Sequence, residues 1–213
     1  MSNTSTFISI EEAIKEFQQN NFLIVMDDET RENEGDLIIP AANITSQQMA
    51  FLVRYSSGYV CAPTTNKRAN ELDLPLMSTL QCQGVKDKKS TAYTMTCDYA
   101  YGTTTGISSA DRSLTCRKLA DLIGTTKPSD FIKPGHIVPL RAVDGGVLVR
   151  RGHTEAAVDL CKLAGLPPVG VIGELVKEDD GLMMRLDDCI EFGKKYNIKL
   201  INVQQLVEYI EKQ

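Results

Sequence analysis

Two continuous apolar runs, residues 22–26 and 37–41, lie close together in the chain and enclose a strongly acidic segment. Apolar runs without alternation are typical of strands that are covered on both faces. The segment between them, residues 27–36, carries six carboxylates and Arg31. The fold must therefore hold a dense negative charge at the ends of buried strands.

Helix signals and further apolar runs alternate along the rest of the chain. The capping-box patterns at residues 9–12 and 45–48 predict helices that begin there, the second continuing to about residue 54. Later helices are predicted over residues 110–123, 154–164, 186–196 and 202–211. Strands are predicted over residues 58–62, 91–97, 137–140, 169–176 and 198–201. Residues 75–90 and 127–135 are predicted to be connections.

This mixture of elements, without strict strand–helix–strand order, favours an α+β fold with a mixed sheet and flanking helices. A length of 213 residues favours one compact domain over residues 1–213. Six cysteines without a Cys-x-x-Cys pair are interpreted as reduced core residues.

Charge and hydropathy exclude two classes of partner. The chain has 23 Lys and Arg against 28 Asp and Glu, a net charge of −5, and its basic residues form no stripe. We therefore expect no nucleic-acid surface. No apolar run approaches the roughly 18 residues of a membrane span, and the first residues are polar. A cytoplasmic protein that binds a small molecule is expected.

The acidic segment has two interpretations. Carboxylates held near a core repel one another, and they gain most by binding a hard cation such as Mg²⁺ or by sharing protons as acid and base. A solvated acidic turn is the alternative. A calcium EF-hand is excluded, because placing Gly35 at the sixth loop position puts Thr30 at the first and Ala41 at the twelfth, where acidic ligands are required.

The two histidines of the chain, His136 and His153, both lie beside glycines in polar segments, unlike core histidines. Residues 150–154 precede a predicted helix, so backbone N–H groups, a hydroxyl and two guanidinium groups could bind one anion, with phosphate the natural candidate. The turn at residues 102–108 could add donors. A structural role remains the alternative for each histidine.

Glu174 interrupts the apolar run 169–176. A charged side chain in a buried strand is costly unless it is paired or used. Such a carboxylate tends to have a raised pKa, which suits a general acid or base near neutral pH. A strand-edge glutamate that faces solvent is the alternative.

Several long motifs resemble the 3,4-dihydroxy-2-butanone 4-phosphate synthase family. The first is I-V-M-D-D-E at residues 24–29, followed by R-E-N-E-G-D-L at residues 31–37. The others follow in the family's order at residues 51–54, 57–61, 103–108, 111–112, 133–136, 139–142 and 151–156. The chain is most similar to the monofunctional fungal branch, since no GTP cyclohydrolase II module is expected after it.

The resemblance implies a lyase of riboflavin biosynthesis. Its substrate would be D-ribulose 5-phosphate and its products L-3,4-dihydroxy-2-butanone 4-phosphate and formate, formed by enolisation, dehydration, skeletal rearrangement and formate loss. It also implies Mg²⁺ or Mn²⁺, with two ions per site, and a homodimer whose active sites lie near the subunit interface.

Site residues follow from the same resemblance. Glu32 and His153 match the family's metal ligands, and His136 and Glu174 match positions essential for catalysis, with Asp36 as a further proton carrier. The implied substrate contacts are Arg31, Glu32, Asp36, Thr91, Arg150, Arg151, Gly152, His153, Thr154 and Glu174. Before Thr91 the chain departs from the family, because Lys-Lys-Ser stands where a basic residue, His and Gly are usual.

Two other functions stay open. A metal-dependent isomerase or aldolase would share the enolisation and stop before the rearrangement, so release of formate distinguishes it. A catalytically silent sugar-phosphate-binding domain would keep Arg150 and Thr154 but would not need His136 or Glu174.

Overall fold

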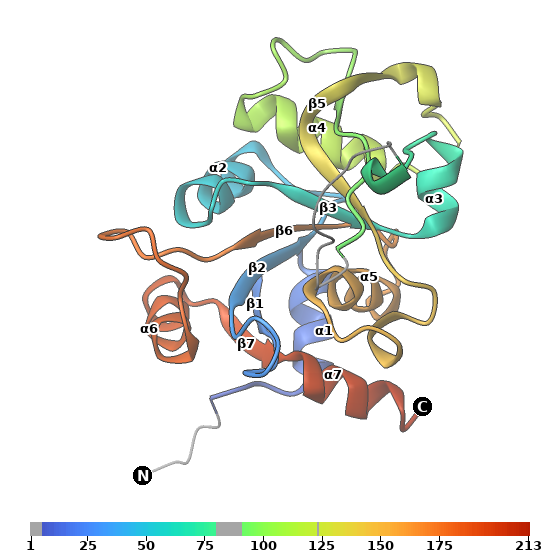
Figure 1. The fold of residues 1–213 in the computed structure, drawn as a ribbon. Helices are drawn as coiled ribbons and strands as arrows, with labels where there is room; N and C mark the ends of the chain where they lie inside the picture. The colour runs from blue at the N-terminus through green and yellow to red at the C-terminus, as the bar shows by residue number, and fades with distance from the viewer. Residues whose placement is uncertain (1–5, 80–90, 123) are drawn as a thin grey trace.

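The computed structural model describes residues 6–79, 91–122 and 124–213. The strands are β1 Leu23–Met26, β2 Gly35–Pro40, β3 Cys61–Thr64, β4 Cys97–Tyr99, β5 Phe131–Arg141, β6 Gly170–Glu174 and β7 Lys199–Asn202. They form one seven-stranded sheet in the order β4-β5-β3-β6-β2-β1-β7 (Figure 1). Pairs β1·β7 and β3·β5 are parallel and the others are antiparallel, which confirms the predicted mixed sheet.

The helices are α1 Ile10–Gln18, α2 Ser46–Tyr55, α3 Asn66–Glu71, α4 Ser109–Leu119, α5 His153–Leu163, α6 Leu186–Tyr196 and α7 Val203–Ile210. Both predicted capping boxes are present, at Ser9 and Thr45. Each places a side-chain oxygen on a backbone N–H that the first helical turn leaves unpaired. None of the helices in the described ranges is long and apolar enough to span a membrane.

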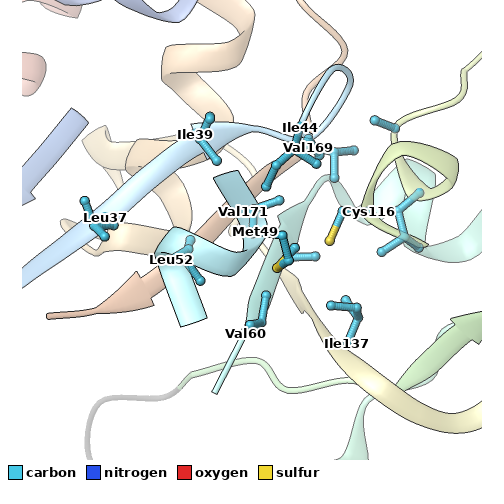
Figure 2. Close-up of a cluster of buried hydrophobic side chains, with 14 of the residues drawn as sticks. Leu37, Ile39, Ile44, Met49, Leu52, Val60, Cys116, Ile137, Val169 and Val171 are labelled. Atoms are coloured by element: carbon cyan, nitrogen blue, oxygen red, sulfur yellow. The ribbon is translucent and has the colours of Figure 1, made fainter. Parts of the chain in front are cut away.

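Alternate side chains of the strands enter two cores, one on each face of the sheet. Leu37 of β2 packs in the core that α2, α4 and α6 cover, whereas Ile38 packs in the core beneath α1, α5 and α7. Figure 1 shows α2 and α6 on one side of the sheet and α1, α5 and α7 on the other. Figure 2 shows side chains of β2, α2 and β6 meeting in the first core. The five cysteines within the described residues are buried and free, as predicted.

The prediction of a connection over residues 127–135 was wrong, because β5 already begins at Phe131. Its register against β4 pairs Ile137 with Cys97 and Ile132 with Asp98. Residues 133–136 therefore bulge out without partners in that ladder. Pro134 is accommodated there, since its missing N–H breaks no ladder bond.

Two predicted strands differ in extent. Residues 91–97 form only isolated bridges, at Tyr93 and Thr94, and the regular strand begins at Cys97. The strand expected over residues 58–62 is shifted to Cys61–Thr64. Most of the predicted connection 75–90 lies outside the described residues, and its described part contains the 3₁₀ turn Met77–Thr79.

Truncation of Leu52 to alanine tests the first core. Leu52 is 0% exposed, so Leu52→Ala should lower the free energy of unfolding by about 2–5 kcal/mol through lost burial and a residual cavity. Urea denaturation followed by circular dichroism measures it. Leu182→Ala is the control, because Leu182 is 63% exposed and its loss should change stability by less than about 0.5 kcal/mol. Equal losses in the two variants would contradict the packing described here.

Candidate active site

The acidic segment is the loop between β1 and β2, and Asp27 anchors it. The buried Asp27 carboxylate accepts hydrogen bonds from the backbone N–H groups of Glu32 at 3.2 Å and Glu34 at 2.9 Å. The Arg31 guanidinium lies 2.8 Å from the same carboxylate. Arg185, before α6, donates to the Glu32 carbonyl at 2.7 Å. Side chains at both ends thus hold the loop, which is not a freely solvated turn.

The loop borders a cavity at the start of β2 and the end of β6. Eight of the ten predicted substrate contacts line this cavity. The complete lining is Arg31, Glu32, Asp36, Tyr59, Cys61, Thr91, Tyr93, Leu140, Arg150, His153, Thr154, Ile172, Gly173 and Glu174. Segments far apart in the sequence therefore meet at one place.

Asp36 and Glu174 lie directly opposite each other in the β2·β6 ladder. Asp36 is buried, and burial, with the negative charge of Glu174 next in effect, raises the pKa of Asp36 well above its usual range. Its Oδ1 has no hydrogen-bond partner among the described residues. Glu174 is exposed at the end of β6, so the prediction of a glutamate inside a buried strand was wrong. Asp36, opposite Glu174 on the adjacent strand β2, is buried.

His153 is buried at the first residue of α5, contrary to the prediction of a histidine outside the core. Its Nε2 lies 3.0 Å from the carbonyl oxygen of Val25. A carbonyl can only accept, so Nε2 carries the proton of the neutral ring and Nδ1 carries the lone pair. Nδ1 lies 3.5 Å from Asp36 Oδ1 and 4.0 Å from Glu32 Oε2. Burial lowers the pKa of His153, which favours this neutral form.

Asp27, Glu32 and His153 could hold a metal ion together, because one ligand atom from each lies within 4.8 Å of the others. The set contains carboxylate oxygens and an imidazole nitrogen but no thiolate, which fits Mg²⁺ or Mn²⁺. The hydrogen bond from His153 to Val25 is the outer contact that usually orients a metal-binding imidazole. Asp27 was missed in the sequence, although its place as the first acid after a buried strand was the available signal.

Arg150 also lines the cavity. Its guanidinium lies 2.6 Å from the buried carboxylate of Glu155 and 3.4 Å from Thr91 Oγ1. Glu155 also accepts the backbone N–H of Val143 at 3.0 Å, so it is fixed from two sides. Thr154 stands in the first turn of α5, where backbone N–H groups favour an anion. Glu155 was not among the predicted site residues.

Three predicted residues have no side chain on the cavity. Arg151 donates to Gln204 at 2.9 Å and lines a neighbouring cavity. Gly152 caps α5, and a Cβ there would crowd the Arg150 guanidinium. His136 stands on β5, where its Nδ1 lies 2.6 Å from Asp98 Oδ2. The predicted donor turn at residues 102–108 is likewise absent from the lining.

Replacing Asp36 should stabilise the metal-free protein. A carboxyl whose folded-state pKa is raised resists ionisation, so above its unfolded pKa of about 3.9 the folded state loses stability as pH rises. Asp36→Asn removes this cost. In EDTA, its midpoint of urea denaturation should exceed that of the parent at pH 7, and the difference should shrink toward pH 4. The exposed Asp187→Asn is the control, and a variant less stable than the parent at pH 7 would contradict the assignment.

Comparison with known proteins places this chain in a described family. The model of the family described as 3,4-dihydroxy-2-butanone 4-phosphate synthase matches residues 11–209. The synthase of Candida albicans is 63% identical over 209 residues, covering 98% of this chain and 100% of that protein. The synthase of Saccharomyces cerevisiae is 62% identical, covering 97% of this chain and 100% of that protein.

Two solved structures are similar to the fold described above. The crystal structure of the Candida albicans synthase has a TM-score of 0.88 at 63% identity and covers 97% of this chain and 99% of that chain. A structure of 3,4-dihydroxy-2-butanone 4-phosphate synthase in complex with two magnesium ions has a TM-score of 0.89 at 45% identity, with coverage of 97% and 98%.

Proposed function

The chain belongs to the 3,4-dihydroxy-2-butanone 4-phosphate synthase family, and from this premise we propose that it converts D-ribulose 5-phosphate into L-3,4-dihydroxy-2-butanone 4-phosphate and formate in riboflavin biosynthesis. One observation carries the proposal. A single cavity brings carboxylates and the His153 imidazole together with the Arg150 guanidinium and the first turn of α5. These are the groups that a polyhydroxy ketone and its phosphate require.

Glu32 and His153, with Asp27, would hold Mg²⁺ or Mn²⁺, two ions per site. The relative solved with two magnesium ions supports this stoichiometry. When bound, such a cation polarises a ketone and stabilises the negative charge that follows proton loss. The unpartnered Asp36 Oδ1 beside His153 also suits a site built to receive positive charge.

Arg150 and Thr154 would bind the phosphate. A guanidinium and the first turn of a helix both favour an anion, and Glu155 holds the guanidinium in one position. Binding energy gained there orients the ketone end. Arg151 faces the neighbouring cavity and Gly152 makes room for Arg150, so neither side chain is part of this proposed contact.

Asp36 and Glu174 would move protons at the ketone end. Asp36 has a raised pKa and can hold a proton in the cavity, and Glu174 stands opposite it across the ladder. Two carboxyl groups in unlike surroundings can divide the roles of acid and base. Enolisation, dehydration and formate loss each require such transfers, and His136 would be the third proton carrier.

Formate release tests the reaction. Pure protein incubated with D-ribulose 5-phosphate should give formate with Mg²⁺ or Mn²⁺ and only background with excess EDTA, because the ligand set suits a hard divalent ion. Glu32→Gln should need more metal for the same rate. Interconversion of sugar phosphates without formate would instead favour the isomerase or aldolase, and binding without turnover would favour the silent binding domain.

We further propose a homodimer whose active sites lie near the subunit interface. Large apolar side chains are exposed beside the cavity and beside His136, with Tyr59 49%, Ile107 52% and Val149 65% exposed. His136 is outside the cavity lining and stands two strands from Glu174, roughly 10 Å by the usual strand spacing. We infer that His136 of a second copy completes each site.

Mixed dimers test this arrangement. His136→Asn and Glu174→Gln should each lower kcat by about 10²- to 10⁴-fold, as expected for a proton-transfer group. Unfolding and refolding the two together should restore about a quarter of the parent activity, because half of the dimers would carry one intact site. Each variant refolded alone is the control. Absence of recovery, with mixed dimers shown by mass spectrometry, would assign His136 to the site of its own chain.

We propose that residues 1–213 act as one synthase domain, and the adjacency of β1 and β7, from opposite ends of the chain, supports this. The cytoplasmic location expected from the sequence stays a prediction.

A further inference from the structure

The bulge of β5 at residues 133–136 is held by the side chains of Thr96 and of Asp98 on β4. Because these residues have no ladder partners on β4, their backbone N–H groups must find other acceptors. The N–H of Gly135 donates to Thr96 Oγ1 at 3.0 Å, and the N–H of His136 donates to Asp98 Oδ1 at 2.8 Å. Asp98 therefore closes the bulge with its first carboxylate oxygen.

The second oxygen of Asp98 contacts the imidazole ring. Oδ2 lies 2.6 Å from Nδ1 of His136, and Asp98 itself is buried. Since one carboxylate binds both the backbone and the ring of His136, the position and the rotation of the ring are set together. The His136 side chain is still 40% exposed, so the ring edge opposite Asp98 remains accessible.

A glycine turn covers the Asp98–His136 pair. Gly106 has a φ of 93°, and a Cβ at this position would overlap the Asp98 carboxylate and lie 2.6 Å from Nδ1 of His136. The turn is held from α4, where Asp111 accepts the N–H groups of Gly106 at 3.0 Å and Thr104 at 3.1 Å. The turn shields the Nδ1 side of the ring, and glycine is the residue that fits there.

We propose that Asp98 is a positioning residue for the reaction, acting through His136. A carboxylate can only accept from the neutral ring, so it holds the proton on Nδ1 and leaves the Nε2 lone pair on the accessible edge. Nε2 is then the atom that exchanges a proton with substrate. The proposal rests on the proposed function, in which His136 carries a proton.

The chain's two histidines consequently have opposite tautomers. His153 donates from Nε2 to Val25, whereas His136 donates from Nδ1 to Asp98. Since the chain has only these two histidines, ¹⁵N-histidine labelling gives a spectrum of two rings, and His136→Asn assigns them. When both rings are neutral, the parent protein should show one tautomer of each kind. An Nε2-protonated His136 in the parent would overturn the proposal, whether or not the protein makes formate.

Kinetics of Asp98→Asn give the second test. The amide can donate its own N–H to Nδ1 and so favour the other tautomer, and kcat should fall by about 10²-fold or more with KM changed only a few-fold. Asp130→Asn is the matched control, because its carboxylate also accepts a backbone N–H, from Lys127 at 2.7 Å, and it should keep the parent kcat.

A double variant separates positioning from a general structural role. If Asp98 acts through His136, Asp98→Asn should cause no further loss of kcat in the His136→Asn background. A loss that multiplies with that of His136→Asn would overturn the proposal, as would a parent-like kcat in Asp98→Asn alone. Failure of the parent to release formate would count against the proposed function, and the spectrum would still report the tautomer.

Discussion

Repulsion between carboxylates at the start of β2 is the constraint on which the site depends. Asp36 is buried, and the charges of Glu174, Glu32, Asp27 and Glu34 all raise its pKa further. Backbone N–H groups that donate to Asp27, and the Arg31 guanidinium beside it, partly offset this repulsion. A pocket of this kind favours a cation or a proton over an empty state. The same arrangement that costs stability therefore suits the cation binding and the acid–base roles proposed for the site.

Local signals predicted most of the fold. The capping boxes predicted the starts of α1 and α2. Helix α6 has the predicted bounds, because the residue after its last turn, Asn197, adopts the left-handed conformation and ends the helix. The buried strand β1 was also expected, since an unbroken apolar run matches a strand between two cores. Such signals depend on neighbours within one or two turns of chain, which is why the sequence alone carries them.

The burial and the partners of the site residues could not be predicted from the sequence, because they depend on strand register and on long-range pairing. The positions of Asp36 and Glu174 were known, but only the β2·β6 ladder decides that the first is buried and the second exposed. Likewise, Pro134 signals a break in a ladder without identifying Asp98, which is 38 residues from His136, as the group that accepts the His136 N–H there. The resemblance identified His136 and left its partner unknown. Partners of this kind follow from tertiary contacts and not from local pattern.

The place of β6 in the sheet has a consequence for synthesis of the chain. β6 lies between β3 and β2, although it follows both by more than a hundred residues in the sequence, and β7 completes the edge beside β1. A nascent chain on the ribosome therefore exposes two unpaired strand edges until residues 170–174 have emerged. During that interval the acidic loop lacks Glu174 and the Arg185 contact, so the site is completed only after these residues have been synthesised. A pause of the ribosome late in translation would prolong the interval in which these unpaired edges can aggregate or bind a chaperone.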